Sequence, residues 1–438
     1  MPAEYTVQGI GITELAERYG TPLYLYDGDG LRERITSLLD RLHPRLEVFF
    51  SLKSNPNIAV CALLHAHGAR AEISSMTELA TALRAGVAPR DIIFLGPGKS
   101  RVELAACLDE GVSTIICESF GELRLIDELA RERGVTARVA LRVNPEFAVK
   151  GSGLTMGGKP RQFGMDEAQL RDPQAVAGLT HVRLMGVQVY MGTRILSEDA
   201  ITENTERILE LAEQISTRLR FPLELVDIGG GLGVAYFENE SDLDFDLLAD
   251  KINPLIDKFA ATHPGTRLVM ELGRYLTAPF GTYATRVRYV KTSMGENFAV
   301  ADGGTNHHMA AVGIGSFVKR NFPMRLLNRI DEPATGEWNI TGPLCTPNDT
   351  LGKKVPLPDV RPGDIVGVER SGAYGPSASP VNFLSHGHPA EVLVLDGRAH
   401  LVRDRDRPDD LLRNQHLPDH DSLARTGSHP SPRKDVTP

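Results

Sequence analysis

The sequence predicts an α/β fold: a (β/α)8 TIM barrel followed by a C-terminal, mostly antiparallel β-barrel or sandwich domain. Eight short, β-rich apolar runs alternate with helix-like segments over the first two thirds of the chain. Most of these runs are continuously apolar, which is typical of parallel strands buried on both faces. After about residue 279 the alternation stops, and strand-like runs follow one another without long amphipathic helices between them.

The expected barrel strands are residues 47–51, 69–74, 91–96, 114–119, 138–143, 184–190, 223–229 and 267–272. Three of the helices that follow begin with an S-x-x-E capping box, in which the serine caps a backbone N–H and the glutamate reaches back. These pairs are Ser75 with Glu78, Ser100 with Glu103, and Ser119 with Glu122. The alternative is an open doubly wound sheet. Eight units favour the closed barrel, whose usual size is roughly 250 residues.

We expect the barrel at residues 28–279 and the β domain at 280–402, with strand-like runs at 282–290, 296–304, 364–370 and 391–402. Asp396-Gly397 lies between two apolar runs and predicts a hairpin turn. Residues 1–27 contain a further run at 21–26, so this segment is expected to join the β domain. Residues 403–438 are charged and then rich in Pro, Ser, His and Asp, and they are expected to form a disordered tail.

Composition excludes several classes of function. The 438 residues carry 48 Lys and Arg against 57 Asp and Glu, a formal net charge of −9, which argues against a nucleic acid as the main partner. The N-terminal residues lack the basic-then-apolar run of a signal peptide, and no uncharged apolar stretch is long enough to span a bilayer. Four cysteines lie far apart without C-x-x-C spacing. We therefore expect a cytoplasmic protein with neither a disulfide framework nor a metal site.

The carboxyl ends of the expected strands bring polar residues to one face, where barrel enzymes have their active sites. Lys53 follows the first strand, and burial in a barrel mouth disfavours the charged amine and permits a Schiff base. The glycines at 229–231 end the seventh strand, where backbone N–H groups and the next helix can bind an anion. Gly273 and Arg274 follow the eighth strand, and phosphate sites are often built from the loops after strands 7 and 8.

Glu271 ends the eighth strand and adds a carboxylate to this face. A lysine that forms an imine, a phosphate cup and a carboxylate for a ring nitrogen together predict pyridoxal 5′-phosphate. The charge-assisted hydrogen bond to the ring nitrogen contributes roughly 1.5–3 kcal/mol. Each residue alone also fits a simpler explanation, namely a surface lysine, a tight turn or a salt bridge. The glycine spacing matches neither a dinucleotide nor a P-loop motif.

With these residues, the chain resembles the fold-type III PLP-dependent decarboxylases, the group of diaminopimelate and ornithine decarboxylases, from about residue 21 to about 402. The resemblance implies an alanine-racemase-type barrel and a homodimer whose active sites are shared between subunits. It identifies Lys53, in FFSLKSNPN, as the catalytic lysine, and Cys345, in GPLCTPNDT, as a catalytic cysteine from the other subunit that reprotonates the product. The cofactor-binding residues that it implies are Lys53, Arg142, Tyr190, Thr193, Gly229, Gly230, Gly231, Glu271, Gly273, Arg274 and Tyr374.

The departures from the family concern the substrate. Diaminopimelate decarboxylases carry a His-x-His whose second histidine stacks on the cofactor, and this chain has Tyr190 there. Thr346 replaces an acidic residue that meets the distal amine, and Ala310 replaces an arginine that meets the distal carboxylate. Because both charged contacts to a free diamino acid are missing, specificity for such a substrate should fall. The expected substrate-binding residues are Thr346, Asp349 and Arg320.

Residues 156–165 (MGGKPRQFGM), 189–193 (VYMGT) and 342–347 (GPLCTP) are similar to one branch, the decarboxylase of butirosin biosynthesis. That enzyme acts on a glutamyl group held on an acyl carrier protein. The resemblance implies loss of CO₂ from such a thioester, which leaves a γ-aminobutyryl thioester. Residues 319–329 (KRNFPMRLLNR) contain four basic residues and no acidic one. They are either a docking segment for an acidic carrier or a solvated loop.

Other functions stay open at this point. The first is decarboxylation of a free amino acid such as diaminopimelate, lysine or ornithine. A racemase is less favoured, because Glu271 and the Cys345 loop suit decarboxylation. A non-catalytic binding homologue belongs to a different class, and the intact Lys53, Glu271 and Cys345 argue against it.

Overall fold

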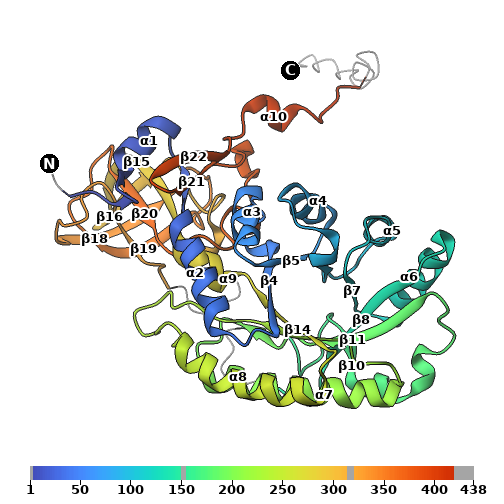
Figure 1. Cartoon of the computed structure of the whole chain (residues 1–438). Helices are drawn as coiled ribbons and strands as arrows, with labels where there is room; N and C mark the ends of the chain where they lie inside the picture. Colours follow the sequence, from blue (N-terminus) through green and yellow to red (C-terminus); the bar gives the residue numbers. More distant parts are fainter. Residues whose placement is uncertain (1–2, 149–153, 313–319, 419–438) are drawn as a thin grey trace, which may run out of the picture.

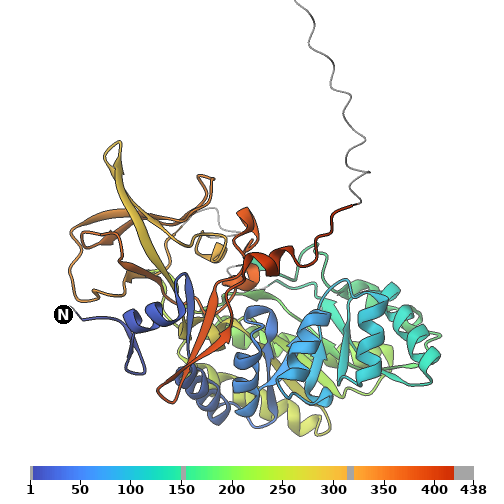
Figure 2. The same ribbon diagram turned by 90° about the horizontal axis from the view of Figure 1, so that it is seen from above.

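The computed structural model describes residues 3–148, 154–312 and 320–418, in which a parallel barrel lies beside a β-rich unit (Figure 1). The barrel carries its helices on the outside, and the β-rich unit contains both the first strands of the chain and the last (Figures 1 and 2). Among the described residues, no helix is long and apolar enough to cross a membrane.

Eight parallel strands of the described chain form the barrel. They are β4 (Leu46–Ser51), β5 (Arg70–Ile73), β6 (Ile92–Phe94), β7 (Thr114–Cys117), β8 (Ala137–Asn144), β11 (Val182–Gln188), β13 (Leu225–Gly230) and β14 (Arg267–Leu272). Each strand pairs with the next one named here, and β14 pairs in parallel with β4 through Glu271 opposite Phe49. This last pairing closes the sheet. The predicted TIM barrel is confirmed, and the open doubly wound alternative is wrong.

The outer helices begin where the capping serines predicted. Helices α4 (Met76–Arg84), α5 (Arg101–Glu110) and α6 (Phe120–Arg133) each have a serine N-cap that accepts a hydrogen bond from the third helical N–H. In α5, Glu103 also accepts from the cap residue, which completes the box. In the other two helices the glutamates accept instead from Ser74 and Glu118, one residue before the cap. The full capping box is therefore confirmed at Ser100, and the serine caps are confirmed at all three positions.

The β-rich unit is a mostly antiparallel sheet. Its strands are β3 (Leu23–Asp27), β15 (Gly281–Ser293), β16 (Glu296–Ala301), β17 (Met324–Leu326), β18 (Gly336–Thr341), β19 (Thr350–Leu357), β20 (Ile365–Val368), β21 (Ala390–Leu395) and β22 (Arg398–Arg403). Strand β3 lies between β15 and β21. Asp396 and Gly397 both have positive φ in the turn between β21 and β22, as a two-residue hairpin requires. The predicted division of the chain at residues 27, 279 and 402 stays a prediction.

Two parts of the sequence prediction need revision here. Strands β17, β18 and β19 were not expected, because they are short or interrupted by Gly and Pro. The tail predicted at 403–438 contains helix α10 (Pro408–Leu412), and the Asp406 side chain accepts a hydrogen bond from the backbone N–H of His388. Residues 419–438 lie outside the described residues.

Two adjacent histidines are buried in the β-rich unit. The His307 ring bonds the carbonyl of Gly387 at 3.0 Å, and the His308 ring bonds the Ser371 hydroxyl at 3.0 Å. Burial lowers the pKa of His307 to about 4 and the pKa of His308 to about 3. Both rings are therefore neutral in the folded protein at any pH above 5. Ser371 leads directly into the segment that carries Tyr374.

This burial predicts an acid-sensitive fold. In the unfolded chain a histidine has a pKa near 6.5, so between roughly pH 6.5 and 4 the unfolded state binds more protons and stability falls as pH falls. We expect urea unfolding to lose up to about 1.4 kcal/mol per pH unit for each histidine in this window. His308→Gln should reduce that slope, whereas His400→Gln, at an exposed position, should leave it unchanged. Equal slopes in both variants would contradict the prediction.

Candidate active site

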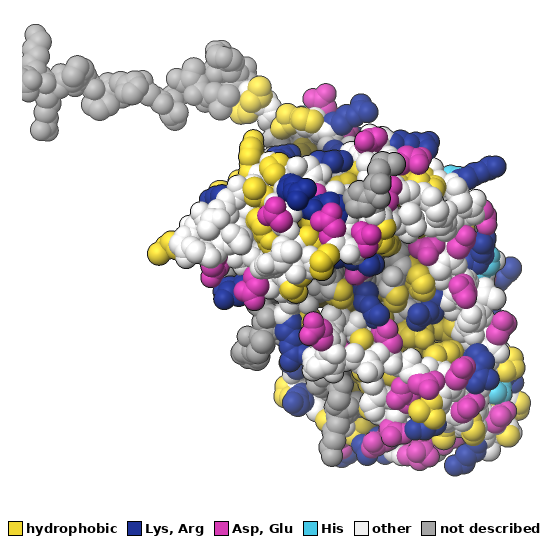
Figure 3. Space-filling view, turned by 90° about the vertical axis from the view of Figure 1, so that its left-hand side faces the viewer, with side chains coloured by type: hydrophobic (Ala, Val, Ile, Leu, Met, Phe, Trp, Pro, Cys, Tyr) yellow, Lys and Arg dark blue, Asp and Glu magenta, His cyan; other side chains and the backbone are white. Residues whose placement is uncertain are grey.

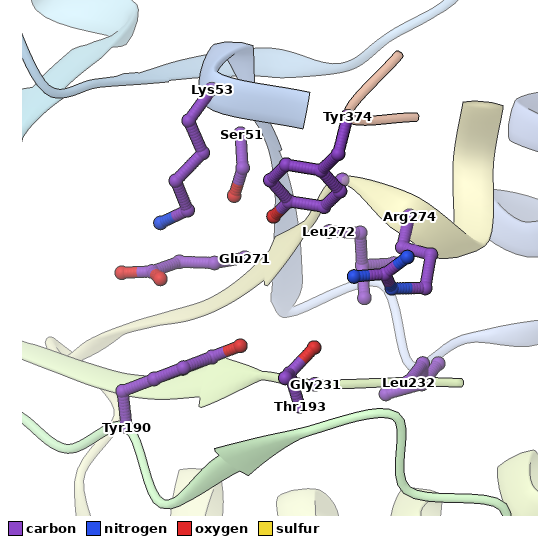
Figure 4. A pocket seen from close by; sticks show the side chains of 11 residues that line it. Ser51, Lys53, Tyr190, Thr193, Gly231, Leu232, Glu271, Leu272, Arg274 and Tyr374 are labelled. Carbon is purple, nitrogen blue, oxygen red and sulfur yellow. The ribbon is translucent and has the colours of Figure 1, made fainter. Parts of the chain in front are cut away.

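A pocket opens at the carboxyl ends of the barrel strands (Figure 4). The space between its walls, including the part open to solvent, is about 320 Å³. The lining residues are Ser51, Lys53, Tyr190, Thr193, Gly231, Leu232, Glu271, Leu272, Gly273, Arg274 and Tyr374. The structure therefore brings together most of the predicted cofactor-binding residues, from both ends of the barrel sequence and from the β-rich unit.

The barrel interior is built in layers, and the pocket stands on a polar one. Apolar side chains fill the lower layer: Phe49, Ile93, Ile116, Ala140, Leu225 and Val269. Two residues further along a strand, the side chain returns to the same face. This register places a second, largely polar layer above the first: Ser51, Glu118, Arg142, Asp227 and Glu271. Charged groups at this depth need partners, because little water reaches them.

Lys53 lies in a 3-10 turn (Leu52–Ser54) directly after β4. Its Nζ donates to Glu72 Oε2 at 3.1 Å and stands 5.8 Å from the centre of the Tyr190 ring. Burial by itself lowers the pKa of Lys53, but the carboxylates of Glu72 and Glu271 outweigh it and hold the pKa above the ordinary lysine value. Burial therefore disfavours the charged amine as expected, but the two carboxylates reverse the net direction and favour the ammonium form. The amine must release a proton before it can act as a nucleophile, and Glu72 is the carboxylate in contact with it.

Glu271 reaches the pocket from the end of β14 and is 2% exposed. Its Oε1 accepts a hydrogen bond from Gln188 Nε2 at 3.2 Å, while its Oε2 is buried and has no hydrogen-bond partner among the described residues. Figure 4 shows the carboxylate between the Lys53 amine above and Tyr190 below. A buried acceptor without a donor is costly, so this oxygen is suited to a ligand that carries an N–H.

The other end of the pocket is suited to an anion. Arg274 donates from Nη1 to the Tyr236 hydroxyl at 2.9 Å, and its guanidinium lies 4.7 Å from the centre of the Tyr374 ring. The Nε of Arg274 is buried without a partner among the described residues. Gly231 has φ +94°, and a Cβ there would overlap the carbonyl oxygen of Gly192. Figure 4 shows Arg274 and Gly231 at the end of the pocket away from Lys53.

The glycine turn differs in one respect from the prediction. The next long helix, α8, begins at Phe245, well beyond Gly231, so the expected helix dipole does not act at this turn. Gly229 and Gly230 shape the turn without lining the pocket. A Cβ on Gly230 would overlap the carbonyl oxygen of Glu271, which explains the need for glycine where β13 passes β14.

Arg142 and Asp349 lie outside the pocket lining. Arg142 is buried in the polar layer, where its Nη1 donates to Glu118 at 2.7 Å. Asp349 is 2% exposed and accepts hydrogen bonds from the backbone N–H groups of Thr305 and Leu344. Asp349 thus anchors the loop that carries Cys345.

Cys345, Thr346 and Arg320 are also away from this pocket. Cys345 is exposed on the loop between β18 and β19, and Thr346 follows it. Arg320 is exposed and donates to Asn239 Oδ1 at 2.9 Å. The predicted substrate residues of this chain therefore do not line its own cofactor pocket.

Three residues of the site went unrecognised as site residues in the sequence. Glu72 contacts Lys53, Asp227 lies in the same polar layer as Glu271, on the neighbouring strand, and Tyr236 accepts a hydrogen bond from Arg274. A signal existed for the first two, because both are carboxylates inside otherwise apolar strands. Tyr236 lies in a loop without a distinctive pattern.

Comparison with known proteins agrees with this geometry. A family model described as pyridoxal-dependent decarboxylase, pyridoxal binding domain, matches residues 29–278. The L-glutamyl-[BtrI acyl-carrier protein] decarboxylase of Niallia circulans is 41% identical over 409 residues, which are 92% of this chain and 96% of that protein. The diaminopimelate decarboxylase of Methanothermobacter thermautotrophicus is 32% identical over 421 residues, which are 94% of this chain and 95% of that protein.

The chain belongs to the fold-type III pyridoxal-dependent decarboxylases. Among solved structures, diaminopimelate decarboxylase from M. jannaschii in complex with L-lysine has a TM-score of 0.85 at 26% identity, covering 95% of this chain and 96% of that one. This decarboxylase is a carboxy-lyase that uses pyridoxal 5′-phosphate. Its pocket fits that cofactor: Glu271 Oε2 is a buried acceptor without a donor, and Arg274 Nε is a buried donor without an acceptor.

The anion end of the pocket leads to a prediction for Arg274. A hydrogen bond to a charged group contributes about 1.5–3 kcal/mol, so Arg274→Ala should weaken pyridoxal 5′-phosphate binding roughly 10- to 150-fold. The measurement is a cofactor titration of the dialysed enzyme, followed by absorbance. Arg90→Ala is the matched control, because the Arg90 side chain is 86% exposed and lies outside the pocket lining. Equal affinities in the two variants would remove Arg274 from the phosphate site.

Proposed function

We propose that this decarboxylase removes the α-carboxylate of a glutamyl group held as a thioester on an acyl carrier protein. The observation that carries the proposal is the absence of charged side chains at the two positions where the family binds a free diamino acid, which are Thr346 and Ala310 here. The name of the 41% identical relative from Niallia circulans supports the same substrate. A tethered substrate has no free distal amine or carboxylate for such side chains to meet.

The residues of the pocket have complementary roles in this proposal. Bound pyridoxal 5′-phosphate draws electrons from the substrate Cα so that CO₂ can leave. Lys53 binds the cofactor covalently, and Glu72 accepts the proton that its amine releases. Glu271 keeps a proton on the ring nitrogen. Arg274, Gly231, Gly273, Thr193 and Tyr374 bind the phosphate.

Tyr190 lines the pocket and is the residue that would stack on the cofactor ring in place of the family's histidine. Burial raises the pKa of Tyr190 to about 12, so its phenol stays protonated throughout the physiological range. Tyr190 can therefore stack and donate a hydrogen bond, but it does not exchange protons near neutral pH as an imidazole would. Proton transfer to the product requires another residue.

Cys345 is suited to that transfer if it comes from a second copy of the chain. It is exposed, and Asp349 fixes its loop by accepting from the backbone of Leu344 at 2.7 Å. Since Cys345 does not line the pocket of its own chain, we place it in the pocket of the partner in a homodimer. Thr346 would enter with it and meet the tethered substrate.

A groove beside the pocket is suited to the carrier protein. It has an empty volume of about 2460 Å³, and Tyr236, which holds Arg274, also lines it. Its rim includes Arg320, Lys353 and Lys354, which are all exposed.

On the face seen in Figure 3, basic and acidic side chains are intermixed. Four glutamates, Glu238, Glu240, Glu296 and Glu369, line the same groove, and the net charge of the chain is −9. Attraction of an acidic carrier therefore depends on the exposed basic side chains of the rim acting locally. Lys319, the first residue of the predicted docking segment, lies outside the described residues.

A panel of CO₂-release assays tests the substrate. We expect turnover of glutamyl-carrier protein, and rates at least roughly 100-fold lower for free glutamate, lysine, ornithine and diaminopimelate, because the free acids lack the binding energy of the carrier. Lys53→Ala should abolish turnover and prevent borohydride from fixing the cofactor to the protein. Activity on free diaminopimelate alone would overturn the proposed substrate.

A charge-reversal experiment tests the groove. Arg320→Glu combined with Lys353→Glu should raise KM for the carrier-bound substrate roughly tenfold or more at low salt, with a smaller effect at high salt, because the attraction is screened. The cofactor absorbance and kcat should stay unchanged. Lys258→Glu, on the exposed face of α8, is the control. An unchanged KM in the double variant would exclude the groove as the docking site.

A further inference from the structure

The floor of the cofactor pocket holds more carboxylates than cations. Glu72, Asp227 and Glu271 are 0%, 0% and 2% exposed. The Lys53 ammonium contacts Glu72, and Arg142, the other buried cation of this layer, is paired with Glu118 at 2.7 Å. Neighbouring carboxylates that share one cation do not all ionise, because like charges at short range repel strongly in a dry interior. One carboxyl group in this cluster must therefore hold a proton.

Asp227 is the member of the cluster without a cation beside it. It lies on β13, opposite Gln188 of β11 and Val269 of β14. Glu271 follows Val269 by two residues on β14, so the two carboxyl groups lie on neighbouring strands in the same polar layer. Its Oδ1 accepts from the backbone N–H of Gly229 at 2.9 Å. Its Oδ2 is buried and has no partner among the described residues. With a proton, Asp227 can donate a hydrogen bond to Glu271.

We infer that Asp227 is a neutral carboxylic acid in the folded enzyme and donates its proton to Glu271, which keeps Glu271 anionic and directed at the ring nitrogen of the cofactor. Asp227 is thus a positioning residue that acts through Glu271. The inference rests on the role proposed for Glu271, and it adds a second carboxyl group behind it. Glu271 then has two donors, Gln188 and Asp227, and both are neutral. The ring N–H of the cofactor would be the charged donor to the Glu271 carboxylate.

The pKa directions agree with this assignment of the proton. Burial raises the pKa of Asp227 well above the ordinary aspartate value, and the Glu271 charge raises it further, while the Gly229 N–H opposes the shift. Burial and Glu72 also raise the pKa of Glu271, but Lys53, the bond from Asp227 and Arg142 all oppose that rise. The cations near Glu271 therefore leave the negative charge on Glu271 and the proton on Asp227.

Asp227 also connects the two ends of the pocket. The oxygen that accepts from Gly229 N–H fixes the start of the glycine turn, and Gly231 of that turn lines the phosphate end. The protonated oxygen faces Glu271 at the ring-nitrogen end. The Asp227 side chain therefore lies between the glycine turn and Glu271, which would hold opposite ends of the cofactor.

Infrared difference spectra of the holoenzyme test the protonation state directly. The wild-type enzyme should show a C=O band of a protonated carboxyl group at neutral pH that Asp227→Asn removes. Glu78→Gln is the control. Burial raises the pKa of Glu78 to about 7, so Glu78 also contributes a band of a protonated carboxyl group. The control variant should remove that band and leave the Asp227 band in place. An unchanged carboxyl band in Asp227→Asn would overturn the inference.

Cofactor affinity provides a second measurement. Asparagine retains both contacts, since its carbonyl can accept from Gly229 and its N–H can donate to Glu271. Asp227→Asn should therefore keep the dissociation constant of pyridoxal 5′-phosphate within about threefold, while Asp227→Ala should raise it at least roughly tenfold, most strongly at low pH where Glu271 becomes protonated. Equal losses in both variants would contradict a neutral Asp227. Glu271→Gln separately tests the proposed role of Glu271 at the ring nitrogen of the cofactor. None of these measurements needs the carrier-bound substrate, so they do not depend on the proposed substrate.

Discussion

The pairing of β14 with β4 is the contact on which the site depends. It closes the barrel, sets Glu271 opposite Phe49, and places the turn that carries Lys53 over the end of the last strand. The two residues come from opposite ends of the barrel sequence, so an open sheet would leave them apart. Closure also excludes water from the polar layer beneath the pocket. The proton assigned to Asp227 depends on this exclusion, because burial raises the pKa of that carboxyl group.

Sequence patterns were sufficient for the barrel because its strands are continuously apolar and its helices begin at serine caps. Lys53, Glu271 and Arg274 were predictable because the carboxyl ends of parallel strands meet on one face. Tyr374 and Cys345 required the family resemblance, since both come from the β-rich unit and no pattern connects that unit to the pocket. The effect of burial on Lys53 was predictable, but its net charge state was not, because it depends on carboxylates from β5 and β14 that meet only in the folded barrel. Asp227 was recognisable as a carboxylate at a strand end, but its role depends on the same neighbours.

The proposed specificity depends both on charged side chains that this chain lacks and on basic side chains that it carries at its surface. Diamino acid decarboxylases of this family bind the far end of the substrate with charged side chains, whereas Thr346 and Ala310 carry none. Recognition then moves from the far end of the amino acid to the surface of its carrier, where Arg320 and Lys353 lie on the rim of a groove. The chemistry at Cα needs no change for this, because Glu271 and Arg274, which would hold the cofactor, are both retained.

Strand β3 has a consequence for the order in which the chain becomes structured. It is made among the first thirty residues, yet its two partners, β15 and β21, begin at Gly281 and Ala390. On the ribosome the whole barrel is synthesised before β3 can pair on either side. During that interval both edges of β3 are open to strands of other chains. The chain therefore depends on synthesis of its last strands to cover an edge that is exposed from the start.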